Sequence, residues 1–159
     1  MAAKKKRQFC YDYPRPSVTV DIAVLKRASR KLQVLLIRRR DDPFASLWAL
    51  PGGFVNEDEP IAAAARRELE EETCVSGVEL TQLGAYGDPG RDPRGWTVSV
   101  LHYCLVDGAA VNPKAADDAA EAQWFPLDDL PPLAFDHDKM LAAVRRRFSP
   151  RPRGGEGRG

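Results

Sequence analysis

The chain is poor in the residue types that build thiol and imidazole sites: three cysteines and two histidines occur among its 159 residues. Cys10, Cys74 and Cys104 are widely spaced and match neither a paired disulfide framework nor a CxxC metal or redox motif. With only His102 and His137 available, a Ser-His-Asp site or a histidine-rich metal site has almost no material. We therefore expect a protein of the reducing cytoplasm whose chemistry depends on other side chains.

Long apolar runs and excess charge are also absent. No stretch approaches the ~20 consecutive apolar residues of a membrane-spanning helix, and the formal net charge is +1. The basic residues 4–7 are not followed by an apolar run of signal-peptide length. The sequence therefore predicts a soluble protein without a membrane partner and without a general electrostatic attraction for nucleic acid.

The length fits one domain, since domains usually have roughly 100–200 residues. An apolar fraction of 43% and a charged fraction of 30% are typical of a packed globular chain. The polar, proline-interrupted start and the Arg/Gly/Pro-rich end predict flexible tails at residues 1–12 and 149–159. The folded domain should span residues 13–148.

Within that domain, hydrophobic patterning predicts alternating strands and helices. We expect strands at residues 17–25, 32–38, 78–86, 96–106 and 122–125, with short extended pieces within 48–55. Pro60 suits the first position of a helix over residues 61–73, and Asp136 suits the cap of a last helix that ends near Phe148. This order predicts an α/β fold in which helices cover the faces of a mixed sheet.

Three glutamates of the predicted helix over 61–73 share one face. Glu68, Glu71 and Glu72 stand at i, i+3 and i+4, which places their side chains at neighbouring points of a helix. Oxygen ligands of this kind favour hard cations such as Mg²⁺, which keeps positions open for water and substrate phosphates. Alone, an acidic run is most often a solvated helix face. Gly52 and Gly53 favour the metal site, because bare backbone can approach a metal or a phosphate closely.

Together these residues resemble the Nudix box, a signature of 23 residues. The match consists of Gly53, five residues, Glu59, seven residues, and then residues 67–75. The one departure is Cys74, which stands where the family usually has a glycine. That glycine ends the helix in a left-handed conformation, which costs a non-glycine residue about 1–2 kcal/mol. The resemblance covers residues 17–148 and implies the Nudix α/β/α sandwich around a mixed sheet.

The resemblance also implies roles for single residues. Arg67 and Glu59 would hold the helix and the loop together, with the Arg67 guanidinium reaching back to Glu59 or bracing a glutamate. The implied catalytic metal ligands, for Mg²⁺ or alternatively Mn²⁺, are Glu68, Glu71, Glu72 and the backbone carbonyl of Gly52.

Hydrolysis also needs an activated water, either through metal coordination or through a carboxylate base. In related hydrolases the base belongs either to the box helix or to a loop before a late strand, which corresponds here to residues 115–121. Asp117, Asp118 and Glu121 are the candidates in that loop, and for each of them an inert acidic residue is the competing interpretation. The sequence leaves both mechanisms open.

Segments outside the box resemble the ADP-ribose pyrophosphatase branch of the family: residues 87–95, 124–127 and 134–138. Pro89 stands where a proline marks ADP-ribose-cleaving members, although a proline in a glycine-rich loop is also ordinary turn chemistry. The implied reaction converts ADP-ribose into AMP and ribose 5-phosphate. Because such relatives commonly build the substrate pocket between two subunits, the resemblance also implies a homodimer.

Arginine side chains offer planar donors to phosphate and ribose oxygens, and aromatic rings can stack on an adenine. Each candidate for such a contact has an equally ordinary interpretation as a surface or packing residue. The candidates for binding the nucleotide are Arg38, Arg39, Arg91 and Arg94, with Trp48 or Phe44 for the adenine.

Three alternatives compete with this hypothesis. Within the enzyme class, the substrate could be a sugar nucleotide, NADH or an oxidised nucleoside triphosphate. A non-catalytic ADP-ribose sensor is a second alternative, but related sensors carry an added winged helix, few residues follow Phe148, and all three box glutamates are present. An RNA-associated protein that uses the basic residues 4–7 and the Arg-Gly end is the third.

Overall fold

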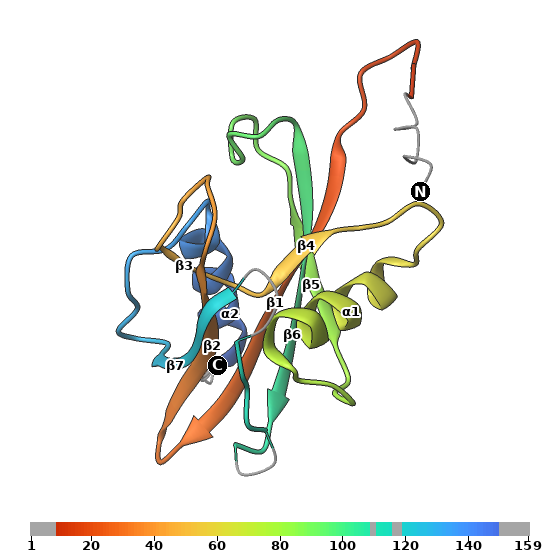
Figure 1. The fold of residues 1–159 in the computed structure, drawn as a ribbon. Coiled ribbons are helices and arrows are strands. Elements are labelled where there is room, and N and C mark those ends of the chain that lie inside the picture. Colours follow the sequence, from red (N-terminus) through yellow and green to blue (C-terminus); the bar gives the residue numbers. More distant parts are fainter. Residues whose placement is uncertain (1–8, 109–110, 116–118, 150–159) are drawn as a thin grey trace, which may run out of the picture.

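The computed structural model describes residues 9–108, 111–115 and 119–149. Most of both predicted tails and the candidate bases Asp117 and Asp118 lie outside the described residues. Figure 1 shows the elements in chain order. They are β1 (Ser17–Ala28), β2 (Lys31–Arg39), β3 (Trp48–Ala49), β4 (Gly52–Phe54), α1 (Ile61–Thr73), β5 (Thr81–Tyr86), β6 (Thr97–Val106), β7 (Ala119–Pro126) and α2 (His137–Phe148).

The strands form one mixed sheet with β1 at its centre. The strand order is β3-β2-β1-β6-β5, while β4 pairs with β1 and β7 pairs with β2. β1 and β6 are parallel, and the remaining pairs are antiparallel. The predicted mixed sheet is therefore confirmed.

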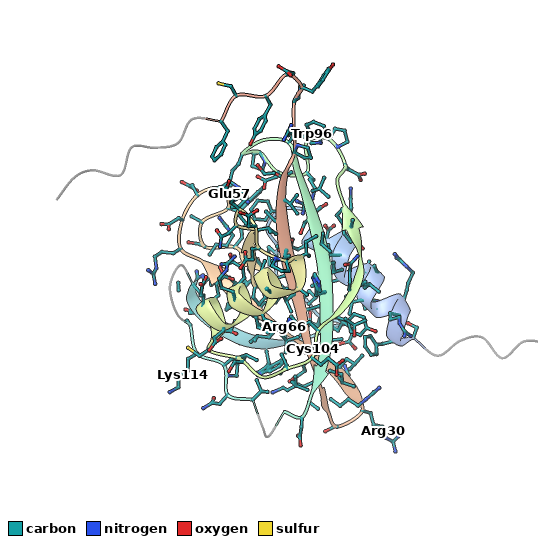
Figure 2. The ribbon with its side chains drawn as sticks, turned by 90° about the vertical axis from the view of Figure 1, so that its right-hand side faces the viewer. Arg30, Glu57, Arg66, Trp96, Cys104 and Lys114 are labelled. Atoms are coloured by element: carbon teal, nitrogen blue, oxygen red, sulfur yellow. The ribbon has the colours of Figure 1, made fainter. Side chains whose placement is uncertain are left out.

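Alternate residues of β1 supply two separate cores because successive side chains of a strand point to opposite faces. Ile22 packs with Leu69 of α1 in one core, whereas Ala23 packs with Met140 of α2 in the other. In Figure 2 the two helices lie on opposite sides of β1 and β6. The arrangement is the expected α/β/α sandwich. Neither helix of the described residues is long and apolar enough to cross a membrane.

The ends of α1 decide where the acidic residues stand. Pro60 is the residue before the helix, with ψ of 139°, so it is not the first helical residue as predicted. At the other end, Cys74 adopts the left-handed conformation with φ of 57°, and its N–H donates to the Glu70 carbonyl at 2.9 Å. The cysteine thus takes the backbone conformation that a glycine would adopt without strain.

Other predicted boundaries also change. β1 continues past Leu25 because its last four residues pair with the start of β2, which leaves a turn at 29–30. β5 begins at Thr81 because Val78 and Leu80 pack against the core beneath α1 instead of pairing. β7 begins at Ala119, earlier than predicted, through its pairing with Arg39.

Candidate active site

Arg67 ties the helix α1 to the loop that precedes it. Its Nε donates to Glu59 Oε1 at 2.7 Å, and its Nη2 donates to the Phe54 carbonyl at 3.0 Å. Its Nη1 also donates to Glu68 Oε1 at 2.6 Å and to Glu71 Oε2 at 3.0 Å. The hydrogen bond from Arg67 lowers the pKa of Glu59 to about 2. Arg67 therefore reaches the loop glutamate and braces two glutamates of the helix at once.

Two glycines bring the loop backbone against the acidic face. The Gly52 N–H donates to Glu72 Oε2 at 2.9 Å. A Cβ on Gly53 would lie 2.4 Å from Glu68 Oε2, and a Cβ on Gly52 would lie 2.1 Å from the Val20 carbonyl oxygen. Both approaches are closer than van der Waals contact allows, so a side chain at position 52 would collide with backbone, and one at position 53 would displace the Glu68 carboxylate.

The carboxylates at this loop are difficult to ionise. Burial raises the pKa of Glu72 to about 8, and the negative charges of Glu68 and Asp21 add to that effect against the hydrogen bond from Gly52. Burial likewise raises the pKa of Glu68. Ionised carboxylates at this partly enclosed point would therefore be stabilised by a cation.

Among the described residues, no three acidic, histidine or cysteine side chains converge as they stand into a set that could hold a metal. The reason is visible in the contacts: Arg67 engages Glu68 and Glu71, and Gly52 engages Glu72. The donor chemistry nevertheless fits a hard divalent cation, because oxygen donors with uncompensated charge face a glycine backbone.

The carboxylates open into a cleft with a volume of about 350 Å³. Glu68 and Glu72 line it together with Arg39 and Arg94, so acidic and basic groups meet in one space. A smaller cavity of about 50 Å³ shares Glu72 and both arginines with the cleft and continues inward to Asp21. Such a space matches a ligand that carries negative charge and is bridged to carboxylates by a cation.

Two of the arginines that line the cleft, Arg39 and Arg94, lie over the same aromatic ring. Arg39 Cζ is 5.0 Å and Arg94 Cζ is 5.2 Å from the Phe135 ring centroid, and Arg94 Cζ is also 4.8 Å from that of Phe54. Asp92 holds Arg94 through both carboxylate oxygens, at 2.8 to 3.2 Å. Burial, followed by the charge of Arg94, lowers the pKa of Arg39. The two guanidinium groups lie beside each other, which suits the binding of an anion.

Other residues singled out from the sequence lie elsewhere. Arg38 contacts Glu121 Oε1 at 3.4 Å on an exposed part of the sheet, and neither residue lines the cleft. Trp48 is partly buried and packs edge to face against Phe125 at 4.7 Å in the α2 core, and it lines neither the cleft nor the smaller cavity. Arg91 lines the smaller cavity, but its side chain is only 4% exposed and is paired with Asp136, the residue before α2.

A buried polar group beneath Gly52 was not predicted. Asp21 interrupts the apolar run of β1 and accepts a short hydrogen bond from Ser99. His137 Nε2 lies 3.2 Å from Asp21 Oδ1, and the Leu50 N–H donates to His137 Nδ1 at 3.0 Å. Because Nδ1 accepts, Nε2 carries the ring proton. An acidic residue inside an otherwise apolar strand is the signal that would have identified this group.

Burial opposes ionisation of Asp21, but attraction to His137, the hydrogen bonds from His137 and Ser99, and the charge of Arg91 outweigh it and lower the pKa of Asp21. Asp21 is therefore a fixed negative charge beneath the cleft.

Comparison with known proteins agrees with this arrangement. The family model described as the NUDIX domain matches residues 15–144. The chain is 42% identical over 134 residues to an ADP-ribose pyrophosphatase of Methanocaldococcus jannaschii, covering 84% of this chain and 76% of the relative. It is 38% identical over 146 residues to the ADPR responsive transcriptional repressor NtrR of Acinetobacter baylyi, covering 89% of this chain but only 58% of the repressor.

Among solved structures, the NUDIX domain of Shewanella oneidensis NrtR, determined as a complex with ADP ribose, superposes with a TM-score of 0.80. The sequence identity is 34%, and the match covers 87% of this chain and 94% of that domain. Fold and sequence thus point to the same group of proteins.

Proposed function

The chain belongs to the NUDIX family and is a Nudix hydrolase, and from this premise we propose that its substrate is ADP-ribose, which it cleaves to AMP and ribose 5-phosphate. The observation that carries the proposal is the single cleft in which Glu68 and Glu72 meet Arg39 and Arg94. Both kinds of group suit a diphosphate. The arginines neutralise its oxygens directly, and the carboxylates would hold a metal cation that neutralises them as well. The names of the similar pyrophosphatase and of the ADP ribose complex support this substrate.

Nudix hydrolases generally use divalent metal ions, and we propose Mg²⁺ here, with Mn²⁺ as the alternative for the same oxygen donors. Glu68, Glu71 and Glu72 would hold it, together with the carbonyl of Gly52. When bound, the metal supplies charge neutralisation at the phosphates and lowers the pKa of water. Arg67 and Glu59 would keep the glutamates at the loop through the contacts described above.

For the chain's own part in the reaction, we assign Arg39 and Arg94 to phosphate oxygens, because both guanidinium groups line the cleft. We assign the proton acceptor to the carboxylates that line the cleft, Glu68 or Glu72. Glu121 is a poorer candidate, since its carboxylate contacts Arg38 outside the cleft.

The proposal is tested by measuring kcat/KM for ADP-ribose, a sugar nucleotide, NADH and an oxidised nucleoside triphosphate, with Mg²⁺, Mn²⁺ or EDTA. We expect ADP-ribose to be preferred and EDTA to abolish turnover. Preference for a triphosphate by orders of magnitude would overturn the substrate assignment.

A sensor of ADP-ribose is the second candidate, because the chain resembles an ADPR responsive transcriptional repressor and a NUDIX domain determined as a complex with ADP ribose. Calorimetry distinguishes the two: ADP-ribose that binds tightly but is not consumed in the presence of Mg²⁺ favours the sensor.

The homodimer and the cytoplasmic location rest on the sequence alone and are proposals here. Sedimentation velocity tests the homodimer.

A further inference from the structure

Three consecutive residues that lead into α2, Phe135, Asp136 and His137, each contact residues that line the cleft or the smaller cavity. Phe135 underlies Arg39 and Arg94, Asp136 pairs with Arg91, and His137 contacts Leu50 and Asp21. Phe135 has φ of +54°, a left-handed conformation that an aromatic residue rarely adopts. Strained backbone of this kind persists where surrounding contacts over-determine it and is concentrated at functional sites.

Asp136 stands where the cap of α2 was predicted, but its side chain makes no cap hydrogen bond. Its two carboxylate oxygens instead accept from Arg91 Nε at 3.0 Å and Nη2 at 2.6 Å, with both side chains less than 10% exposed. This buried pair fixes residues 87–95 against α2. The same loop carries Arg94, whose guanidinium is held by Asp92, so the pair anchors the segment that presents Arg94 to the cleft.

His137 fixes a different segment, residues 50–52. Leu50 N–H donates to His137 Nδ1 at 3.0 Å, and the next carbonyl, that of Pro51, accepts from the Ile22 N–H at 2.9 Å. Gly52 N–H then donates to Glu72. Three successive residues are thus bound by α2, β1 and α1 in turn, and a shift at the first would move the glycine that faces Glu72.

We propose that Asp136 and His137 are positioning residues with separate effects, Asp136 on nucleotide binding through Arg91 and Arg94, and His137 on turnover through Leu50 and the glycine loop. The inference rests on the proposed function, since it assumes that Arg94 and Glu72 act on one diphosphate. Neither residue needs to touch the substrate. Each acts through a neighbour, Arg91 or Leu50, that lines the smaller cavity.

The first arm of the test uses Asp136→Asn and Arg91→Lys, which each break the bidentate contact. We expect either change to raise KM for ADP-ribose about tenfold with kcat within about twofold, because loss of a positioned anion contact weakens binding in ground and transition state alike. Asp138→Asn is the matched control: it removes the same charge from an exposed position in the same helical turn. It should leave both constants unchanged.

The second arm uses His137→Phe, which removes both ring nitrogens, and His137→Asn, which restores an acceptor near the place of Nδ1. We expect the phenylalanine variant to lower kcat about tenfold or more, on the scale of lost supporting contacts around a metal site. The asparagine variant should recover most of that loss. A merely structural role would not produce this rescue or the division between KM and kcat.

Backbone hydrogen exchange without substrate provides a readout independent of the reaction. His137→Phe should accelerate exchange at Leu50, whereas Asp136→Asn should accelerate it only within residues 87–95. If the wild-type protein does not cleave ADP-ribose but hydrogen exchange changes as described, the proposed function fails and the positioning roles stand. Their effects on kinetics are then measured with the nucleotide that the substrate panel identifies. If ADP-ribose is cleaved but both variants lower kcat and raise KM together, or Asp136→Asn matches Asp138→Asn, the positioning proposal is overturned.

Discussion

Glu72 Oε2 accepts a hydrogen bond of 2.9 Å from the backbone N–H of Gly52, a residue twenty positions earlier in the chain. The bond joins the acidic face of α1 to the loop beside β1, and it orients a carboxylate whose pKa burial raises to about 8. Glu72 is thus held at the one point where helix, loop and cleft meet. The first prediction concerns this residue.

Glu72→Gln should lower kcat/KM for ADP-ribose by at least about 100-fold, because an amide is a poor ligand for a hard cation. The fold should be retained, since the amide oxygen still accepts from Gly52 and the neutral group no longer repels Glu68 and Asp21. Thermal unfolding in EDTA measures whether the variant keeps its fold and its stability. Glu70→Gln, an exposed change on the same helix, is the control, and equal activity of the two variants would refute the role of Glu72.

The two box glycines should respond differently to alanine. Gly52→Ala places a methyl group against the Val20 carbonyl, which is backbone and cannot move away, so we expect a loss of stability of about 1–3 kcal/mol. Gly53→Ala meets only the carboxylate of Glu68, which can swing aside. It should lose activity with a smaller loss of stability. Gly84→Ala, with nothing within 4 Å of the added Cβ, should change neither. Denaturant unfolding and kcat/KM together separate these effects.

Cys74→Gly should stabilise the protein by about 1 kcal/mol, because the left-handed conformation at the end of α1 is strained for every residue with a Cβ. Cys74→Ala keeps the Cβ and should stay near the wild-type stability. The free energy of unfolding in urea measures the difference. A glycine variant no more stable than the alanine variant would show that the strain is negligible, and kcat should be unchanged in both.

Arg94→Ala should raise KM for ADP-ribose about tenfold or more, since a charge-assisted hydrogen bond to a phosphate is lost. Arg38→Ala is the comparison, because Arg38 contacts Glu121 outside the cleft. Steady-state kinetics at several salt concentrations test both variants, and the difference in KM should shrink as salt rises. If Arg38→Ala had the larger effect, the assignment of the cleft arginines would be wrong.

The buried thiol of Cys104 should make stability fall at alkaline pH. Burial raises the pKa of Cys104 from 9.0 to about 11, partly offset by a hydrogen bond with the Leu25 backbone. Because the pKa is raised in the folded state, the contribution of the protonated thiol to folding stability is fully present below the pKa of the unfolded chain, near 9.0. It is lost as pH rises through the folded-state pKa of about 11. The loss between these values should be on the order of 1–2 kcal/mol larger in the wild-type protein than in Cys104→Ala. Chemical unfolding across this pH range measures it, and parallel curves would contradict the prediction.

Local spacing was sufficient for the acidic face. Glu68, Glu71 and Glu72 share one side of α1 because a helix has 3.6 residues per turn. The sequence predicts this helix with its observed end at Thr73 and with a start that differs only at Pro60. The contact of Arg67 with Glu59 was also predictable, since both lie within one short segment. The predicted bounds of β1, β5 and β7 were less accurate, because the ends of a strand depend on which residues find a pairing partner in a neighbouring strand.

The two arginines of the loop 87–95 show what spacing leaves undecided. Arg91 and Arg94 have the same side chain in the same turn-rich segment, and the sequence makes both candidates for the nucleotide. Arg91 is buried against Asp136, 45 positions away, whereas Arg94 reaches the cleft. The difference comes from a partner on another element.

The order and spacing of residues along the chain were enough to identify the family, the α/β class and the acidic face of one helix, because each of these follows from residues close to one another in the sequence. Only the folded structure shows that Arg39, and not its neighbour Arg38, lines the cleft, and that Asp21 lies beneath Gly52 with His137. Those choices depend on which face of the sheet a side chain points to and on what α2 places opposite it. Such pairings join residues more than a hundred positions apart, as Asp21 and His137 show, and local spacing does not reveal which residue the partner is.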